Sequence, residues 1–176
     1  KANPGKISFS SNGVGGTQHL GVELFAYRMG LKFVHVPYKD GAQSTMDMVS
    51  GVVQMLFGGS LLIPHAKAGK VHIIATGNLQ RTGALPEVPT FDESGLPGYD
   101  VSSWFSVMTV GGTPAPIIDR IYRETEAIIK ITRAGQGHQN SDVEFQSSTP
   151  EELGKRIKDE LVTWTKVIKD TGIKPE

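Results

Sequence analysis

The sequence contains no cysteine, which excludes disulfide bonds, thiolate catalysis and cysteine-based metal sites. It has no excess of either charge, because 18 lysines and arginines balance 18 aspartates and glutamates. Without a basic block the chain has no electrostatic attraction to nucleic acid or anionic lipid, and we expect neither as a partner. No apolar run approaches the roughly 18 residues of a membrane span. Residues 1–6 also lack the apolar stretch of a signal peptide, so any export signal is expected upstream of Lys1.

The first part of the chain consists of short apolar runs separated by glycine and proline. Strands are predicted at residues 7–9, 33–36, 52–57 and 71–76. Helices are predicted at residues 17–29, 42–50 and 61–68. This βαβαβαβ alternation predicts an α/β fold with a mainly parallel sheet and helices on its faces.

The pattern then changes to turn residues over 78–98, where Thr90 and Glu93 at capping-box spacing predict one brief helix. Residues 101–110 are apolar and aromatic and are expected to be extended. Within them, Trp104-Phe105 could pack in the core or wall a cleft, and we favour the core because large aromatic side chains mostly serve packing.

Two further helices are predicted in the last third of the chain. Thr113 with Pro114 or Pro116 can open a helix that runs to about Arg133. Thr149-Pro150-Glu151-Glu152 is a stronger start signal, because the hydroxyl, the proline and the glutamate all suit their positions in a capping box. An apolar stripe from Leu153 to Ile168 follows it.

A glycine turn between a strand and a helix is the main candidate site. Residues 8–25 read SFSSNGVGGTQHLGVELF. Gly13-Val14-Gly15 begins like a dinucleotide-binding fingerprint, but Gln18 stands where the third glycine belongs. A phosphate loop needs a hydroxyl residue after Gly-Lys, and neither Gly5-Lys6 nor Gly69-Lys70 has one. We therefore predict no nucleotide cofactor, and no other cofactor.

Catalysis at this turn is an alternative. Ser10 or Ser11 could be a nucleophile with His19 as its base, but neither serine lies in a Gly-x-Ser-x-Gly context and no carboxylate can be nominated to orient the histidine. A glycine turn that only changes the chain direction is a second alternative. The five histidines have no metal-ligand spacing, so no metal site is predicted, and His35 is expected to be packed within its strand.

Anion binding is the third interpretation of this turn. A helix that begins near Thr17 presents unpaired backbone N–H groups and the positive end of its dipole, and the glycines allow a ligand to approach them. Glycine turns follow two further predicted strands, at residues 38–44 and 58–60. In a parallel sheet all three turns lie at the same carboxyl edge, where ligands of such folds bind.

Six stretches together resemble one family. They read, in order, KANPGKISFSSNGVGGTQHLGVELF, FVHVPYKDGAQSTMDMVSG, PHAKAGKVHIIATGN, RTGALPEVPTFDESGLPGYDVSSWF, GTPAPIIDRI and TPEELGKRIKDELVTWTKVIKDTGIKPE. In sequence and spacing these stretches are similar to the substrate-binding proteins of tripartite tricarboxylate transporters, the TctC or Bug family. The resemblance extends over nearly the whole chain.

The resemblance implies a bacterial periplasmic receptor that is not an enzyme. Two α/β lobes of the type II periplasmic-binding-protein fold would close over a small carboxylate and deliver it to a membrane permease. The ligand-binding positions carried over from the family are Ser10, Ser11, Asn12, Gly13, Val14, Gly15, Gly16, Thr17, His19, Tyr38, Lys39, Gly41, Ala42, Gly58, Gly59 and Ser60.

The sequence departs from the family pattern at three places. Family members carry further residues before the equivalent of Lys1, including the opening strand–helix units of the first lobe. The resemblance therefore implies that residues 1–100 form the second lobe, and residues 101–176 the crossing strand and the carboxyl-terminal part of the first. The family often has aspartate or asparagine at Gly58-Gly59, and ITRAGQGHQN at residues 131–140 also differs from its pattern.

The incomplete first lobe has a consequence for assembly, and the fold leaves one further interpretation of the function open. An isolated lobe exposes apolar surface and sheet edges, which favours homo-oligomerisation or strand exchange. Because fold does not fix function, an effector-sensing module that takes no part in transport is a further alternative to the receptor and to the hydrolase.

Overall fold

The computed structural model describes residues 4–134 and 145–173. Its sheet has three parallel strands in the order β2-β1-β3. The strands are β1 (Ser8–Ser11), β2 (Val34–Pro37) and β3 (Met55–Leu56). The register places Phe9 of β1 between His35 and Met55 on its two neighbours. The predicted α/β fold with a parallel sheet is confirmed.

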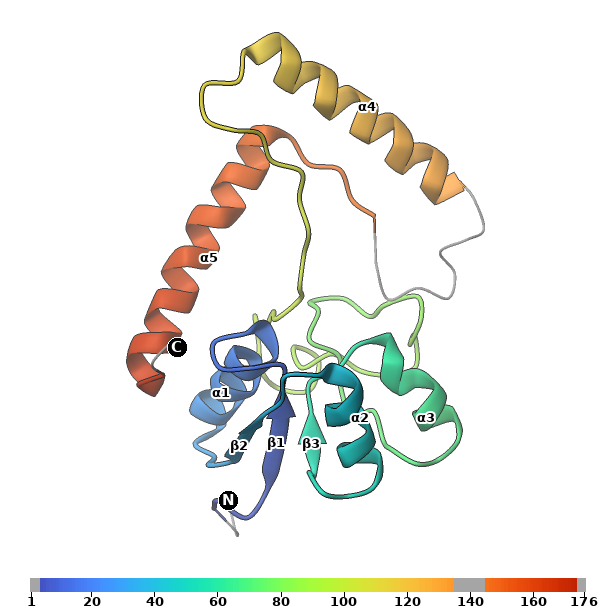
Figure 1. Ribbon diagram of the computed structural model, residues 1–176, viewed down its shortest axis with the longest axis vertical. Coiled ribbons are helices and arrows are strands. Elements are labelled where there is room, and N and C mark those ends of the chain that lie inside the picture. Colours follow the sequence, from blue (N-terminus) through green and yellow to red (C-terminus); the bar gives the residue numbers. More distant parts are fainter. Residues whose placement is uncertain (1–3, 135–144, 174–176) are drawn as a thin grey trace.

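Five α-helices and one short 3-10 helix accompany these strands in the described residues (Figure 1). They are α1 (Thr17–Met29), α2 (Gly41–Val49), η1 (Ser60–Leu62), α3 (Ile63–Lys67), α4 (Ala115–Ala134) and α5 (Pro150–Thr171). The bounds predicted for α1 are confirmed at both ends. The capping box predicted for α5 is also confirmed, because Thr149 and Glu152 exchange side-chain-to-backbone hydrogen bonds.

The core lies between α1, the sheet and the loop that follows α3. Leu96, Tyr99 and Val101 form its buried centre. The side chains packed around them are Leu24, Phe25, Phe57, Phe91 and Trp164. The Tyr99 hydroxyl donates a 2.6 Å hydrogen bond to the carbonyl oxygen of Gly21, so the buried phenol has a partner inside α1.

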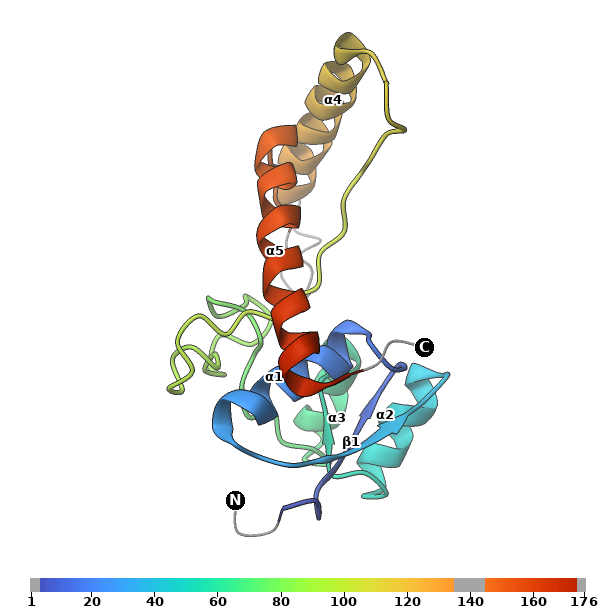
Figure 2. The ribbon, with the colours of Figure 1, turned by 90° about the vertical axis from the view of Figure 1, so that its left-hand side faces the viewer.

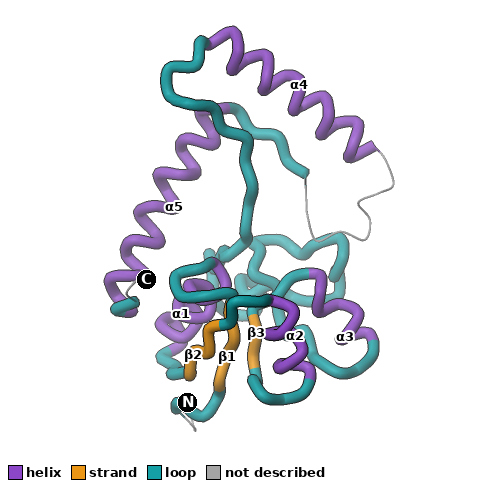
Figure 3. The backbone as a smooth tube through the Cα atoms, viewed as in Figure 1, coloured by secondary structure: helices purple, strands orange, loops and turns teal. Residues whose placement is uncertain are grey.

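Three predicted elements did not form in the described residues. Residues 71–76 make no strand, and their one ladder contact is an isolated bridge between Thr76 and Thr90. Thr90 and Glu93 exchange the hydrogen bonds of a capping box, but the residues after Thr90 form a turn and no helix. Residues 101–110 have no strand partner and run as a loop from the core to α4 (Figure 3). A strand needs a neighbouring edge, which an apolar pattern cannot supply.

The last two helices extend away from the sheet. α5 packs against α1 near its carboxyl end, while α4 lies far from the sheet in both views (Figures 1 and 2). Side-chain hydrogen bonds to Trp104 and Tyr27 link α5 to the rest of the chain. The Trp104 indole N–H donates to the carboxylate of Glu160 at 2.8 Å, and the Tyr27 hydroxyl donates to that of Asp170 at 3.2 Å.

Candidate ligand-binding site

The three glycine turns lie at one edge of the sheet. Each follows the carboxyl end of a strand, and the three strands are parallel. The turns of β1 and β2 also touch, because a Cβ added at Gly41 would lie 3.2 Å from Asn12 Oδ1. Topology therefore brings together turns that are far apart in the sequence.

The first turn needs glycine for its backbone shape. Gly13 and Gly15 have φ angles of 117° and 80°, a region that other residues rarely adopt. Gly16 is the N-cap of α1, and its backbone is extended. Among the described residues no side chain caps this helix, and its first turn contains no acidic residue, so its first-turn amides are not paired with a side chain.

A shallow pocket of about 240 Å³ opens at these amides. Its lining residues are Asn12, Gly16, Thr17, Gln18 and Ser103. Four of them belong to the turn and the first turn of α1, and Ser103 comes from the segment that leaves the core. Exposed backbone donors at the positive end of a helix dipole, with hydroxyl and amide side chains around them, suit a carboxylate.

The amino-terminal ends of α2 and α5 differ from that of α1. Asp40 caps α2 and accepts a 2.9 Å hydrogen bond from the Ala42 amide, so a carboxylate of the chain already occupies the anion position there. Thr149 caps α5, with two glutamates in its first turn. Of these three helices, only α1 presents uncapped amides to a ligand.

Two amides of the first turn are bonded within the turn itself. The Asn12 N–H donates to Gln18 Oε1 at 3.0 Å, and the Gly15 N–H donates to His19 Nδ1 at 3.0 Å. Within residues 4–134, the backbone N–H groups of Gly16, Thr17, Gln18 and His19 have no hydrogen-bond partner in the protein. These amides are therefore the α1 donors that remain for a ligand.

His19 and His35 stack beneath the turn. Their ring centroids are 3.9 Å apart, and His19 is buried. Burial lowers the pKa of His19, while burial and the neighbouring His19 lower the pKa of His35 to about 4. Glu23 lies 3.8 Å from His19 Nε2, and burial raises the pKa of this carboxyl group. Both imidazoles are therefore neutral at neutral pH.

Ser10 and Ser11 are fully buried. The Ser44 hydroxyl donates to Ser10 Oγ at 2.8 Å, so Ser10 lies between β1 and α2 and does not face the pocket. The Ser11 hydroxyl donates to the Gly13 carbonyl oxygen at 3.0 Å, and its Oγ lies 2.7 Å from His35 Nε2. In this arrangement both serines support the turn from within.

The second turn contributes less to the pocket. The Tyr38 hydroxyl donates to Asp47 Oδ2 at 2.7 Å, which raises the pKa of Tyr38 and directs its ring toward α2. Lys39 and Ala42 are exposed, and Gly41 lies against Asn12. None of these residues lines the pocket.

The third turn is shaped by packing. A Cβ at Gly58 would lie 2.5 Å from Leu62 Cδ1, so a side chain there would require the Leu62 side chain to shift. The Gly59 carbonyl oxygen accepts from the Leu62 N–H at 3.1 Å.

The Ser60 side chain lies outside the described part of the structure, as does His138. Val14 is half-buried within the first turn and is not a lining residue.

Several residues at this site were not predicted. Gln18 lines the pocket and Asp40 caps α2, and both could have been found from their positions in a helix first turn and at an N-cap. Ser103 and His35 come from other parts of the chain, so only the tertiary structure reveals them. The prediction that Trp104 and Phe105 pack in the core is wrong for Phe105, which is 94% exposed. Trp104 is half-buried under the Arg156 guanidinium.

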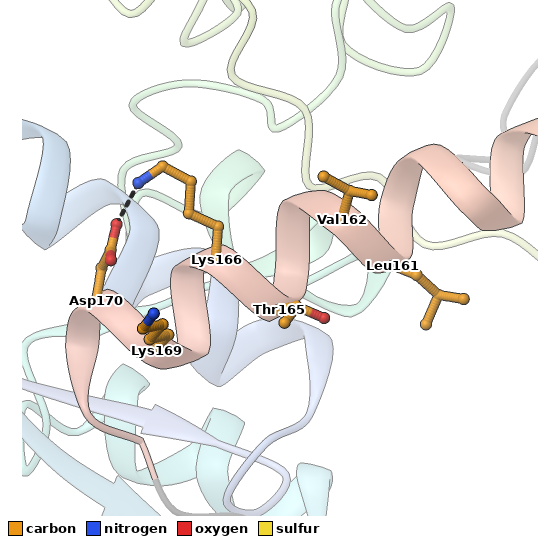
Figure 4. Close-up of a pocket in the computed structure, with 6 residues that line it drawn as sticks. All are labelled: Leu161, Val162, Thr165, Lys166, Lys169 and Asp170. Atoms are coloured by element: carbon orange, nitrogen blue, oxygen red, sulfur yellow. Dashed lines mark hydrogen bonds and ion pairs between the residues drawn. The ribbon is translucent and has the colours of Figure 1, made fainter.

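A larger hollow of about 550 Å³ lies on α5 (Figure 4). Its lining residues are Leu161, Val162, Thr165, Lys166, Lys169 and Asp170. All six belong to one helix, so no second element encloses a ligand there.

Among residues 4–134 and 145–173, no helix has the length and apolar character needed to cross a bilayer. In the same residues, no cluster of histidine, aspartate or glutamate could hold a metal ion.

Comparison with known proteins identifies the family of this chain. Residues 1–173 match the family TctC, described as the tripartite tricarboxylate transporter family receptor. Protein BugT of Bordetella pertussis is 30% identical over 99% of this chain and 54% of its own length. A UPF0065 protein from the tcbD-tcbE intergenic region of a Pseudomonas species is 32% identical over 96% of this chain and 51% of its own. The chain thus spans about half the length of these curated relatives.

Solved structures have the same fold. An R. palustris protein determined with adipate superposes with a TM-score of 0.82 at 28% identity, over 99% of this chain and 59% of that one. The periplasmic binding protein BugD gives a TM-score of 0.79 at 26% identity, over 99% of this chain and 60% of its own. Since the family match covers nearly every residue, the chain belongs to the TctC/Bug family of tripartite tricarboxylate transporter receptors.

Proposed function

We propose that this chain is part of a periplasmic receptor that binds a small organic carboxylate and passes it to the membrane permease of a tripartite transporter. The observation that carries this proposal is the uncapped amino terminus of α1, which opens into a pocket beside Asn12, Thr17 and Ser103. The family membership and the adipate named for the R. palustris structure support a carboxylate ligand. A di- or tricarboxylate is the expected class.

The binding step needs no covalent chemistry. One carboxylate oxygen pair accepts from the α1 first-turn amides, and the side chains of Asn12, Thr17 and Ser103 supply further polar groups. Residues 1–100 would act as the second lobe, and residues 101–176 as the crossing segment and the carboxyl-terminal part of the first. A ligand that touches both lobes favours the closed state through the additional contacts it makes there.

The serine hydrolase alternative has less support. Ser11 Oγ lies 2.7 Å from His35 Nε2, but Ser11 is fully buried and does not line the pocket, so a substrate does not reach its hydroxyl. His19 Nδ1 is already an acceptor for Gly15. The family and fold are those of solute-binding proteins.

A charge placed at the N-cap tests the site directly. Gly16 is extended, and an added Cβ would have only an ordinary 3.7 Å contact, so Gly16→Asp can cap α1 as Asp40 caps α2. We expect Gly16→Asp to keep its melting temperature and lose carboxylate binding, because its own carboxylate occupies the amides. Gly16→Ala is the matched control and is expected to bind.

Thermal-shift and calorimetric titrations with adipate, succinate and citrate provide the measurement, with the uncharged diamide of adipate as the ligand control. A ligand at about 100 times its Kd adds roughly 2.7 kcal/mol of stability. Equal binding by Gly16→Asp and the wild type would contradict the proposed site. Ester turnover abolished by Ser11→Ala would favour the hydrolase, and anion binding without any transport of the ligand would favour a sensor.

A further inference from the structure

The stacked histidines connect the two glycines that give the turn its shape. His19 Nδ1 accepts from the Gly15 N–H at 3.0 Å. On the other side, His35 Nε2 lies 2.7 Å from Ser11 Oγ, whose hydroxyl donates to the Gly13 carbonyl oxygen. The turn is therefore held at both positive-φ glycines by a pair of imidazoles whose centroids are 3.9 Å apart.

The hydrogen bond from Gly15 determines which ring nitrogen of His19 carries the proton. His19 can accept from Gly15 only when Nδ1 carries no proton, so its proton is on Nε2, the nitrogen that faces Glu23. Ser11 Oγ lies within hydrogen-bond distance of both the Gly13 carbonyl oxygen and His35 Nε2, and the direction of the His35 bond follows the tautomer of that ring. The Gly15 contact needs a neutral His19 ring, because a second proton on His19 would place two donors against each other at Gly15.

We propose that the His19–His35 pair is a proton-sensitive latch that holds the 12–17 turn in the shape that presents the α1 amides. The latch extends the proposed carboxylate-binding function and identifies His19 and His35 as positioning residues. Protonation of His19 repels the Gly15 N–H and places a positive charge against the face of His35, so the turn opens and ligand affinity falls.

The surroundings of the pair set the direction of this response. Phe9 of β1 stacks on His35 at 4.8 Å and on His19 at 6.0 Å, which keeps water from the rings. The ionisable groups recorded against His19 in residues 4–134 are Glu23 on α1 and His35 on β2. A Glu23 carboxylate favours the protonated ring, whereas burial and the second imidazole oppose it. Burial prevails, because it lowers the pKa of His19.

Nuclear magnetic resonance of the whole chain tests the latch without any ligand. Ring nitrogen shifts report the tautomer and titration of His19, and the Gly15 amide reports its hydrogen bond. We expect Nδ1 to be unprotonated at neutral pH and the Gly15 amide shift to titrate with the same midpoint as His19. A Gly15 amide that does not respond to His19 titration overturns the proposal.

Binding measurements then separate the latch from the function. His19→Asn keeps an acceptor oxygen at the Nδ1 position but does not titrate, so, whatever its Kd at pH 7.5, we expect that Kd to change with pH only as the ionisation of adipate does. The wild-type Kd should rise at least tenfold more than that of His19→Asn as pH falls through the His19 midpoint. Adipate ionises identically in both titrations, so its contribution cancels in the ratio of the two Kd values. His72→Gln, on an exposed loop, should follow the wild type.

The outcomes are distinguishable. If the wild type binds none of the carboxylates at pH 7.5, the proposed function fails, and the NMR titration alone decides the latch. If wild type and His19→Asn bind with the same pH profile, the latch is wrong and the receptor function stands. A His19→Asn variant that does not fold leaves the decision to the wild-type Gly15 titration.

Discussion

The sheet part of the molecule, residues 4–101, and the helical part, α4 with α5, are built differently. Within the described residues, every buried apolar side chain except Val167 lies between Phe9 and Val101. The helical part instead exposes a large share of its apolar side chains, and Val162 is 72% exposed. No residue of α4 whose burial is described is buried. The sheet part therefore has its own core, whereas the helical part is attached to it through α5.

The site belongs to the better packed part. Its turn rests on buried Phe9, Ser11 and His19. A rigid base suits a receptor, because ordered donors lose little entropy when a ligand binds. Ser103 is the one lining residue outside this part, and it stands where the chain leaves the core.

The largest expected effect comes from Tyr99→Ala. Tyr99 is fully buried, its ring is 4.7 Å from that of Phe91, and its hydroxyl bonds to Gly21. Its removal should cost roughly 3–5 kcal/mol of unfolding free energy, measured by urea denaturation. Phe105→Ala, the matched control on the loop to α4, should change stability by less than about 0.5 kcal/mol. Similar losses for both variants would mean that the loop to α4 is packed as well as the core of the sheet part.

Hydrogen exchange should separate the two parts next. We expect the amides of β1 and the middle of α1 to exchange at least about 100-fold more slowly than those of α4, because α4 can open without exposing a buried core. Exchange read by mass spectrometry on peptides from both elements makes the measurement. Equal protection of α4 and α1 would show that α4 has partners in solution that cover its apolar side.

A smaller effect is expected from acid. Because the pKa of His35 is lowered from 6.5 to about 4, the unfolded chain binds a proton between these values that the folded chain does not. The free energy of unfolding therefore decreases as the pH falls from 6.5 toward 4. After allowance for solvent screening, about 1 kcal/mol should be lost, which lowers the melting temperature by roughly 2–4 °C. A melting temperature that stays constant or rises over this range would contradict the environment assigned to His35.

The smallest effect should come from within the helical part. Thr149→Ala removes the capping box of α5 and should cost about 1 kcal/mol or less, since helix ends far from the core contribute little to global unfolding. Thr149→Ser, which keeps the hydroxyl, is the control, and circular dichroism during thermal unfolding is the measurement. A loss as large as that of Tyr99→Ala would mean that α5 is part of the main cooperative unit.

Sequence patterns predicted local elements well where the signal was itself local. The bounds of α1 came from an amphipathic pattern between Thr17 and Gly30, and the start of α5 came from its capping box. Residues 71–76 and 101–110 failed because a β-strand requires a partner, and partners come from distant parts of the chain. Of the predicted site residues, Asn12, Gly16 and Thr17 line a pocket, whereas Ser10 is buried against Ser44.

The sequence by itself determined the glycine turns, the helix starts and the family, because these depend on neighbouring residues and on their order. The difference between the two helix ends is also local, because Asp40 caps α2 while no side chain in the described residues caps α1. The tertiary structure adds Ser103 to the pocket, from a segment more than eighty residues away. It also decided that His19 and His35 stack, because parallel pairing of β1 with β2 sets the face on which His35 lies.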